Sequence, residues 1–302
     1  MLDIISVGPG EAVLLTDDAK QAIDRADAVW CAARHAVLVP PEKARPLSPL
    51  EGAIEQMRLS GDAGQRAAVL VSGDAGLYSL LEMLKRKIGG EYLRVHPGVS
   101  ALQLFAARLG VSWQDAKILS AHGRALSESA LCHAVRTHRQ TFCFLDAAHN
   151  PAWVRESLNL GGLENVRLFV GERLSYPDER TEAYDPDATY DPLCMAYIEN
   201  DAPESGLPPV GLSDEAFIRG KTPMTKRDVR ALVVSALHLK PNGVVWDIGA
   251  GTGSVSVECA RQCPLGEVYA VEMKDEALDL IRRNAERFHA LNLRVVPGRA
   301  PE

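Results

Sequence analysis

Short runs of apolar residues alternate along the chain with longer segments in which apolar residues recur every three or four positions. The short runs are typical of buried parallel strands, and the longer spacing is typical of amphipathic helices. We predict strands at Ile4–Val7, Ala28–Cys31, Ala67–Val71, Leu93–Val95, Lys117–Ser120, Thr141–Leu145, Val166–Val170 and Cys194–Ile198. The predicted helices are Thr16–Arg25, with Thr16 as N-cap, Leu77–Ile88, Ser100–Leu109 and Pro151–Leu158. This alternation predicts an α/β fold of two small lobes that meet near residues 96–112.

A segment rich in proline and glycine interrupts the pattern at Asp201–Gly211, and nothing periodic crosses it. We therefore predict one domain over residues 1–200, a linker over 201–211 and a second domain over 212–302. The second domain shows strands at Val244–Ile248, Glu267–Val271 and Arg294–Val296, and helices at Lys226–Leu237 and Ser254–Cys263.

The first strand of the second domain ends in the most informative motif of the chain, Asp247-Ile248-Gly249-Ala250-Gly251-Thr252-Gly253. A strand, a glycine turn and a helix form a nucleotide-type site, because the glycines let the backbone approach a ligand at the helix N-terminus. Glu272 ends the next strand, where a carboxylate commonly holds ribose hydroxyls. Ser254 stands where the dinucleotide fingerprint needs glycine or alanine, which argues against NAD. An ordinary glycine loop is the plainer alternative.

Four further turns each follow a predicted strand directly: Val7–Gly10, Ser72–Gly76, His96–Ala101 and Ser120–Arg124. Any one of them is explained by loop chemistry alone. Because ligands of open α/β sheets bind at the carboxyl ends of the strands, the four together predict one shared cleft.

Composition is that of an ordinary globular protein: 302 residues, 46% hydrophobic and 24% charged, with a net charge of −7. The acidic balance argues against nucleic acid as the main partner. No membrane helix or signal peptide is recognisable, so we expect a cytoplasmic protein. Its six cysteines lack metal-site spacing, and we expect reduced, buried thiols and no metal. They are Cys31, Cys132, Cys143, Cys194, Cys259 and Cys263.

In combination these motifs resemble the tetrapyrrole methylase family. The segments VGPG (7–10), SGDAGLYSL (72–80), HPGVSA (96–101) and SAHGR (120–124) carry the likeness, and VGERLSYPDERT (170–181) points to the cobalamin-pathway branch that methylates carbon 5 of a precorrin. GLSDEAF (211–217), MTKRDVRAL (224–232) and GAGTGSVSVE (249–258) resemble a partner domain that methylates carbon 15 and removes a carboxyl group from an acetate. The resemblance implies a two-lobed tetrapyrrole methylase domain followed by the first half of a Rossmann-like class I methyltransferase sheet.

The resemblance implies S-adenosylmethionine as cofactor, a small-molecule precorrin as substrate, and a homo-oligomer. The implied cofactor contacts are Pro9, Ser72, Gly73, Asp74, Leu77, Ser100, Ala101, Leu145, Thr225, Gly249, Ala250, Gly251, Thr252, Gly253, Glu272 and Ala300. Several have a plainer interpretation: Asp74 closes an Asx-turn, Thr225 caps a helix, and Leu77 and Leu145 are core.

Two departures from the family pattern bear on the site. Some relatives place an Asp after the second strand, where this chain reads Cys31–His35. Many carry Gly-Asp-Ala where this chain has Gly298–Ala300, and Arg299 cannot accept the adenine hydrogen bond that the Asp would accept.

Methyl transfer asks mainly for alignment, because the sulfonium is already activated. A proton must then leave the methylated carbon, and His122 and His35 are the candidate acceptors. Arg34, Arg124 and Arg173 are candidates for binding the substrate carboxylates. The alternatives are structural histidines and surface arginines.

The second domain supplies only three strands, so its first strand is expected to have an unpaired edge. We expect a truncated form in which the second activity is doubtful. The alternative functions are methylation at carbon 5 alone, a non-catalytic tetrapyrrole- or nucleotide-binding module, or an NAD-dependent oxidoreductase.

Overall fold

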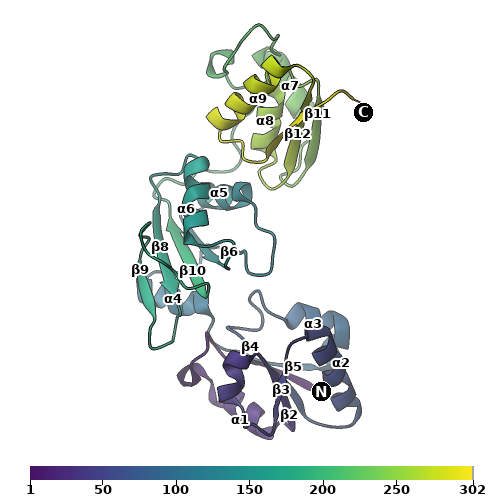
Figure 1. The fold of residues 1–302 in the computed structure, drawn as a ribbon, viewed down its shortest axis with the longest axis vertical. Helices are drawn as coiled ribbons and strands as arrows, with labels where there is room; N and C mark the ends of the chain where they lie inside the picture. The colour runs from purple at the N-terminus through teal and green to yellow at the C-terminus, as the bar shows by residue number, and fades with distance from the viewer. Residues whose placement is uncertain (301–302) are drawn as a thin grey trace. The chain divides into compact units, whose positions relative to one another are not determined.

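The computed structural model describes residues 1–300 (Figure 1). Contacts within the chain divide it into two compact units. Unit 1 comprises Met1–Gln114, Val170–Glu182 and Thr189–Met195, and unit 2 comprises Asp115–Phe169, Ala183–Ala188 and the chain from Ala196 onward. The α/β class with parallel sheets is as predicted.

A five-stranded parallel sheet forms the centre of unit 1. Its order is β3 (Ala44–Pro46), β2 (Ala28–Cys31), β4 (Ala67–Val71), β1 (Leu2–Ser6) and β5 (Leu93–His96). The helices are α1 (Asp17–Arg25), α2 (Leu50–Asp62), α3 (Leu81–Ile88) and α4 (Ala101–Leu109), with 3₁₀ turns η1 (Ala12–Leu14), η2 (Ala33–Leu38) and η3 (Gly90–Tyr92). The turns after β1, β4 and β5 therefore follow neighbouring strands.

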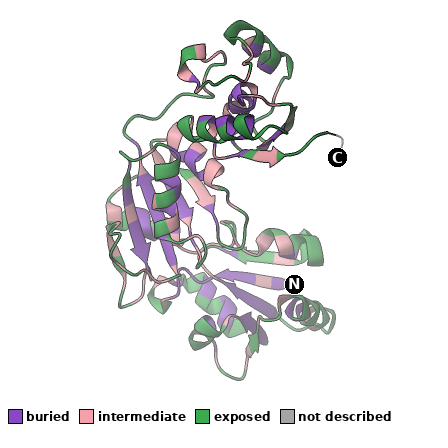
Figure 2. Cartoon of the chain, turned by 45° about the horizontal axis from the view of Figure 1, so that its top comes forward, coloured by how far each residue is buried: buried purple, intermediate pink, exposed green. Residues whose placement is uncertain are grey.

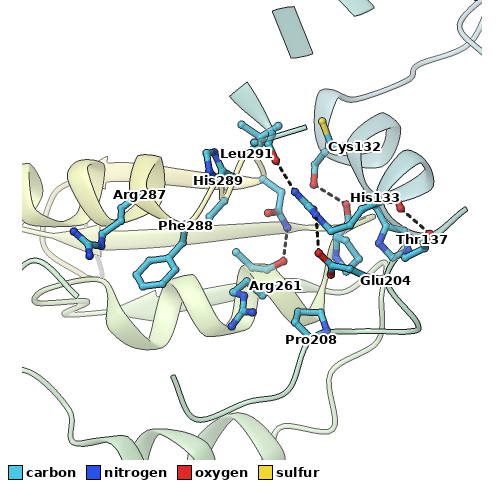
Figure 3. A pocket seen from close by; sticks show the side chains of 18 of the residues that line it. Cys132, His133, Thr137, Glu204, Pro208, Arg261, Arg287, Phe288, His289 and Leu291 are labelled. Atoms are coloured by element: carbon cyan, nitrogen blue, oxygen red, sulfur yellow. Dashed lines mark hydrogen bonds and ion pairs between the residues drawn. The ribbon is translucent and has the colours of Figure 1, made fainter. Parts of the chain in front are cut away.

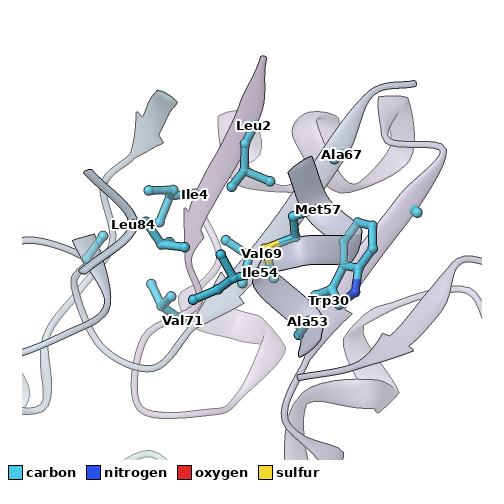
Figure 4. Packing of buried hydrophobic residues seen from close by; sticks show 12 residues of the cluster. Leu2, Ile4, Trp30, Ala53, Ile54, Met57, Ala67, Val69, Val71 and Leu84 are labelled. Carbon is cyan, nitrogen blue, oxygen red and sulfur yellow. The ribbon is translucent and has the colours of Figure 1, made fainter. Parts of the chain in front are cut away.

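Both faces of this sheet are covered, which explains why its strands are almost continuously apolar. All five residues of β4 are buried. On one face Ile54 and Met57 of α2 pack with Leu84 of α3 against Ile4 and Val69 (Figure 4). Ala19, Ala22 and Ile23 of α1 pack on the opposite face. Figure 2 shows the strands as buried and the outer sides of the helices as exposed.

A second five-stranded sheet has the order β6 (Lys117–Ser120), β7 (Gln140–Phe144), β10 (Cys194–Glu199), β8 (Arg167–Glu172) and β9 (Arg180–Ala183). Helices α5 (Glu128–Thr137) and α6 (Pro151–Leu160) accompany it, and α5 contacts β6 and β7. Aromatic packing fills the centre of the sheet, where the Tyr197 ring lies 4.7 Å from Phe142 and 6.0 Å from Phe169.

The last part of unit 2 is a three-stranded parallel sheet of order β11 (Val244–Ile248), β12 (Glu267–Glu272) and β13 (Leu293–Pro297). Its helices are α7 (Arg227–Ala236), α8 (Ser254–Gln262) and α9 (Asp275–Arg287), preceded by the 3₁₀ turn η4 (Asp214–Ala216). β11 pairs only with β12 among residues 1–300, so the predicted open edge is observed. One face of β11 is exposed and apolar: Val244, Trp246 and Ile248 are 63%, 62% and 54% exposed.

Element boundaries follow the predictions closely where apolar runs are bounded by turns. β2, β4, β6 and β11 match to the residue. The helix expected at Leu77–Ile88 begins only at Leu81, because the Leu77 N–H donates to the Asp74 carbonyl and closes a turn instead. Helices α2, α5 and α9 and the short strands β3 and β9 were not predicted. No helix within residues 1–300 is long and apolar enough to cross a membrane.

Candidate active site

Three of the four predicted turns meet at the carboxyl edge of the first sheet. Gly8 and Gly73 exchange both backbone hydrogen bonds, at 3.2 and 2.7 Å. The Ala75 N–H donates to Ser6 Oγ (2.9 Å), and the Gly98 N–H donates to Asp74 Oδ2 (3.3 Å). The loops after β1, β4 and β5 thus form one backbone cradle at the strand ends, the position where open α/β sheets bind ligands.

Gly98 is required by this close approach. A Cβ built on it would lie 2.8 Å from both the Cβ and the carbonyl oxygen of Ser6, closer than real Cβ contacts. Any side chain at this position would push the turn after β5 away from the turn after β1. The width of the cradle therefore depends on the absence of a side chain at Gly98.

Several predicted cofactor contacts have structural partners already. Asp74 Oδ1 accepts from the Gly76 N–H at 2.8 Å, which is the Asx-turn of the plainer interpretation. Ser100 caps α4 in a capping box with Gln103. Ala101 begins that helix, so its first-turn N–H groups lie beside the cradle. Pro9 is buried and Leu77 half-buried in the same loops.

His96 anchors the end of β5 immediately before the Pro97-Gly98 turn, which sequence reasoning did not predict. The ring is 3% exposed, with Nδ1 2.5 Å from Asp18 Oδ2 and Nε2 2.9 Å from Asp3 Oδ1. Burial lowers the pKa of His96, but the hydrogen bonds to the two carboxylates outweigh it and raise the pKa overall. His96 thus ties β5 to β1 and α1 beneath the cradle.

Arg34, His35 and Ser72 form a hydrogen-bonded cluster at the ends of β2 and β4. His35 Nε2 lies 2.8 Å from Ser72 Oγ, while Arg34 Nε donates to the same Nε2 (3.2 Å) and Arg34 Nη2 donates to Ser72 Oγ (2.6 Å). Burial of the ring, helped by the neighbouring Arg34 charge, lowers the pKa of His35 to about 4. His35 is therefore neutral at physiological pH.

Arg173 follows β8 in unit 1 and already has acidic partners. Its Nε lies 2.6 Å from Asp178 Oδ2 and its Nη1 3.6 Å from Asp191 Oδ2. The hydrogen bond to Asp178 raises the pKa of Arg173, so the guanidinium stays charged. Two carboxylates offset that charge, which leaves it less available to an acidic ligand than Arg34.

In unit 2 the turn after β6 carries His122 and Arg124, both exposed. The Ala121 N–H donates to the Phe144 carbonyl at 2.9 Å. That bond holds the Ser120–Arg124 turn beside the end of β7, where Leu145 is 2% exposed. These predicted residues therefore lie together at the carboxyl ends of two parallel strands.

The glycine loop of unit 2 and the turn after β12 both donate hydrogen bonds to one carboxylate, that of Glu272. Glu272 Oε2 accepts from the Gly251 N–H (3.0 Å), and Oε1 accepts from the N–H groups of Met273 (2.8 Å) and Lys274 (3.1 Å). Burial works to raise the pKa of Glu272, but the three backbone donors outweigh it and lower the pKa. The ionised carboxylate keeps acceptor capacity for hydroxyl groups of a ligand.

Buried polar residues hold the loop from below. Asn284, fully buried on α9, donates from Nδ2 to the carbonyls of Thr252 (2.9 Å) and Ile218 (3.0 Å). Asp247 Oδ2 accepts from Ser256 Oγ at 2.5 Å. A Cβ on Gly253 would lie 3.1 Å from Ile281, so helix α8 can start this close to α9 only with glycine at its N-cap.

Arg230, on α7, connects that helix to α8 and to the segment that precedes α7. It is fully buried, and its Nε donates to Glu258 Oε1 at 2.7 Å while Nη1 donates to the Thr225 carbonyl at 2.6 Å. Thr225 does not cap α7, whose N-cap is Lys226 without a side-chain bond, so that alternative was wrong. The turn after β13 also lies beside Glu272, because the Gly298 N–H donates to the Glu272 carbonyl at 2.9 Å. Ala300, a predicted cofactor contact two residues further on, is exposed.

A separate cavity of about 310 Å³ in unit 2 lies away from this loop (Figure 3). Residues Phe288–Asn292 and Pro264 line it, and they precede β13 and β12, so it lies at the amino ends of the strands. Two of its basic side chains bond main-chain carbonyls, His289 to that of Leu160 (2.8 Å) and Arg136 to that of Gly161 (2.6 Å). Opposite the glycine loop, it is not the candidate cofactor site.

The cysteines are buried, as predicted, and none of the six forms a disulfide within residues 1–300. Burial raises the pKa of Cys132 and of Cys259 to about 12, so these thiols stay protonated and unreactive. Within residues 1–300, no group of three or more His, Cys, Asp or Glu side chains could hold a metal ion.

Parallel sheets with glycine turns at their carboxyl ends define an α/β protein of the kind that binds nucleotide-type cofactors. Residues 1–185 match the family model of Tetrapyrrole (Corrin/Porphyrin) Methylases, and residues 215–302 match that of a precorrin methyltransferase domain. The chain belongs to the tetrapyrrole methylase family, as its motifs predicted.

Individual relatives support both halves. A precorrin-6Y C(5,15)-methyltransferase [decarboxylating] of Sinorhizobium sp. is 32% identical over 99% of this chain and 74% of its own length. A cobalt-precorrin-6B C(15)-methyltransferase (decarboxylating) of Salmonella typhimurium is 47% identical over 30% of this chain, which spans 47% of that relative. The solved precorrin-6Y methylase of Archaeoglobus fulgidus shares the fold of the first region, with a TM-score of 0.51 at 21% identity, covering 67% of this chain and 98% of that one.

Proposed function

We propose that this chain is an S-adenosylmethionine-dependent methyltransferase that methylates carbon 5 of a precorrin-6 intermediate in corrin ring biosynthesis. The backbone cradle formed by the turns after β1, β4 and β5 carries this proposal, because three loops converge there at the strand ends. Family membership and the motifs agree on methyl transfer and on S-adenosylmethionine as donor. Neither the family match nor the relatives support an NAD-dependent oxidoreductase.

The chemistry needs few reactive groups. The sulfonium is activated already, and the enamine-like carbon of a reduced tetrapyrrole is nucleophilic, so the protein mainly aligns carbon, methyl and sulfur. Pro9, Ser72, Gly73, Asp74, Leu77, Ser100, Ala101 and Leu145 are the proposed cofactor residues. Proton removal after transfer is assigned to His122, whose exposed ring is accessible to a ligand.

A second candidate activity belongs to residues 212–302: methylation at carbon 15 with loss of an acetate carboxyl group. The Glu272 carboxylate, held by three backbone N–H groups beside the glycine loop, favours it. Thr225, Gly249, Ala250, Gly251, Thr252, Gly253 and Ala300 complete the proposed second cofactor site. The chain spans about half the length of its carbon-15 relatives, so this activity is proposed separately from the first.

In this proposal residues 1–200 and 212–302 are the two functional domains and 201–211 the linker between them. Homo-oligomerisation and the absence of a nucleic-acid partner remain predictions. The following experiment separates two alternatives. One is an enzyme that methylates carbon 5 alone, and the other is a module that binds a tetrapyrrole without methyl transfer.

Titration calorimetry with S-adenosylhomocysteine tests the proposal by counting sites per chain. Gly98→Ala is expected to weaken one site by about tenfold or more, because its Cβ would meet Ser6 at 2.8 Å. The matched control is Gly52→Ala, whose Cβ would lie 3.9 Å from its nearest neighbour, Pro49. Glu272→Ala is expected to remove a second, independent site.

Methyl transfer to a precorrin-6 substrate is then followed by mass spectrometry. A gain of one methyl group that Gly98→Ala slows supports the carbon-5 activity, and a second gain with loss of CO₂ supports the carbon-15 activity. Binding of S-adenosylhomocysteine with no methyl transfer would favour the binding module instead. A chain that binds no S-adenosylhomocysteine at either site would overturn the proposal.

A further inference from the structure

Arg34 has neutral hydrogen-bond partners, whereas several arginines of unit 1 pair with carboxylates. Its two hydrogen-bond acceptors are the His35 ring and the Ser72 hydroxyl, and within residues 1–300 it pairs with no carboxylate. By contrast, Arg66 pairs with Asp27 at 3.0 Å, and Arg173 pairs with Asp178 and Asp191. The positive charge of Arg34, which is exposed, is held in place without being neutralised.

The hydrogen bonds also fix the state of His35. Because Arg34 Nε carries a hydrogen, His35 Nε2 must be the unprotonated nitrogen, and the ring proton sits on Nδ1. Nδ1 is buried and has no hydrogen-bond partner among the residues that the structure describes. The Nε2 lone pair already faces two donors, Arg34 Nε and the Ser72 hydroxyl. The basic nitrogen Nε2 is thus occupied by protein donors, and it could take a proton from a ligand only if these hydrogen bonds broke.

The surroundings suit an amphiphilic ligand. A cavity of about 650 Å³ opens at the carboxyl ends of β2 and β3, and Ala33 and Ala36 of η2, the same turn that carries Arg34, line it. Leu47 and Leu80 add to its apolar wall. Arg45 also lines it, and within the described part of the chain it donates only to the main-chain carbonyls of Glu42 (2.9 Å) and Ala44 (2.8 Å). An apolar wall with the Arg45 guanidinium in it, and with Arg34 on the adjoining turn η2, matches a macrocycle that carries peripheral carboxylates.

We infer that His35 is a positioning residue which, with Ser72, holds the Arg34 guanidinium ready to bind a carboxylate of the tetrapyrrole substrate, and that it is not the proton acceptor. This inference rests on the proposed function for the identity of the substrate. Two neutral acceptors restrict the guanidinium to one orientation and leave its charge for the ligand, as bidentate recognition of a carboxylate requires.

The test compares variants that keep or remove the acceptor. His35→Gln can still accept a hydrogen bond but cannot act as a base near neutral pH, whereas His35→Leu can do neither. Arg34→Gln removes the charge itself. Arg66→Gln is the matched control, because it removes an exposed arginine charge from the same unit at the opposite, amino end of β4.

KM for the precorrin is expected to rise about tenfold or more in Arg34→Gln and in His35→Leu, with kcat and its pH profile little changed. The KM of His35→Gln should stay within about threefold of the wild-type value. Combining His35→Leu with Arg34→Gln should raise KM little further, because both substitutions disable the same hydrogen-bonded cluster. S-adenosylhomocysteine affinity should stay within about threefold of the wild type in all of them, because the substitutions free Ser72 but leave the backbone cradle in place. If His35→Gln instead loses kcat as severely as His35→Leu at unchanged KM, His35 is a base and the inference is overturned.

A binding measurement separates this inference from the proposed function. The probe is uroporphyrin, a tetrapyrrole with eight carboxylates, followed by its own fluorescence on titration with protein. Weaker binding to Arg34→Gln and His35→Leu, with Arg66→Gln and His35→Gln unaffected, supports the carboxylate anchor even if no methyl transfer occurs. Equal binding to all the variants contradicts it even if the chain is an active methyltransferase.

Discussion

The two candidate cofactor sites use the same architecture and differ in how their polar groups are used. In unit 1 the cradle is assembled from three separate turns, and both oxygens of its one acidic residue, Asp74, bond to the loops themselves. In unit 2 the Glu272 carboxylate joins one continuous glycine loop to the turn after β12: Oε2 accepts from the Gly251 N–H of the loop, and Oε1 accepts from the Met273 and Lys274 N–H groups of the turn. The first site therefore offers backbone groups to a ligand, and the second offers a carboxylate.

The largest effect is expected from breaking the support of the second site at Arg230. Glu258 is 1% exposed, and Arg230→Leu leaves it buried without its cation, which costs about 3–5 kcal/mol of unfolding free energy. Urea denaturation followed by Trp246, on β11, should report the loss. Arg283→Leu, which breaks the exposed pair with Asp279, should change stability by less than about 1 kcal/mol. Equal effects of the two substitutions would show that the Arg230 network does not stabilise this region.

The next effect distinguishes the sites by charge. Glu272→Gln removes the carboxylate that accepts the Gly251 N–H of the loop, and it should weaken S-adenosylhomocysteine binding at the second site by roughly 1.5–3 kcal/mol. The first site should be unaffected, since Glu272 belongs to unit 2 alone. Calorimetry that resolves two sites would measure both at once. Unchanged affinity at the second site would mean that Glu272 only shapes the loop.

The pKa of Glu272 adds a pH dependence with a defined sign. Because the three N–H groups hold its folded-state pKa below the ordinary 4.5, the carboxylate stabilises the fold fully above 4.5. That contribution is lost as pH falls through the folded-state pKa. In Glu272→Gln the free energy of unfolding of this region should therefore fall less steeply with decreasing pH than in the wild type, as measured by urea denaturation at several pH values below 4.5.

His96 predicts the opposite pH dependence for unit 1. Its pKa is raised, so the stabilisation by Asp3 and Asp18 is complete below the ordinary value of 6.5 and disappears as pH rises through the folded-state pKa. Stability measured by urea denaturation should fall by on the order of 1 kcal/mol across that window. In His96→Gln this fall in the free energy of unfolding with rising pH should disappear. A wild-type slope that His96→Gln leaves intact would assign it to another group.

Sequence patterns predicted the strands and the continuous loop better than the dispersed site. Ala67–Val71 and Val244–Ile248 could be read directly because turns bound each apolar run. The carboxylate at Glu272 was predictable for the same reason, since it ends a strand. His96 with Asp3, 93 residues away, and Arg230 with Glu258, 28 residues away, could not be predicted. Such pairs depend on which strands and helices become neighbours, and hydrophobic periodicity does not contain that information.

Helix α2 illustrates a different failure. Ala53, Ile54 and Met57 have helical spacing and are buried against the sheet, so the signal was present in the sequence. The segment follows several prolines and lacks a side-chain N-cap, and its start therefore had no marker. Its packing against β4 and α3, rather than its own propensity, stabilises it.

The smallest effect is expected at Asp74, and it tests the contrast between the sites most directly. In Asp74→Asn the side-chain carbonyl still accepts from the Gly76 N–H, and only the longer bond from the Gly98 N–H (3.3 Å) is lost. If the first site binds its ligand through backbone groups, S-adenosylhomocysteine affinity should stay within about threefold of the wild type. Asp74→Ala should weaken binding more, because it also removes the Asx-turn. A loss in Asp74→Asn as large as that in Glu272→Gln would mean that the Asp74 charge contacts the ligand, and that both sites recognise it with a carboxylate.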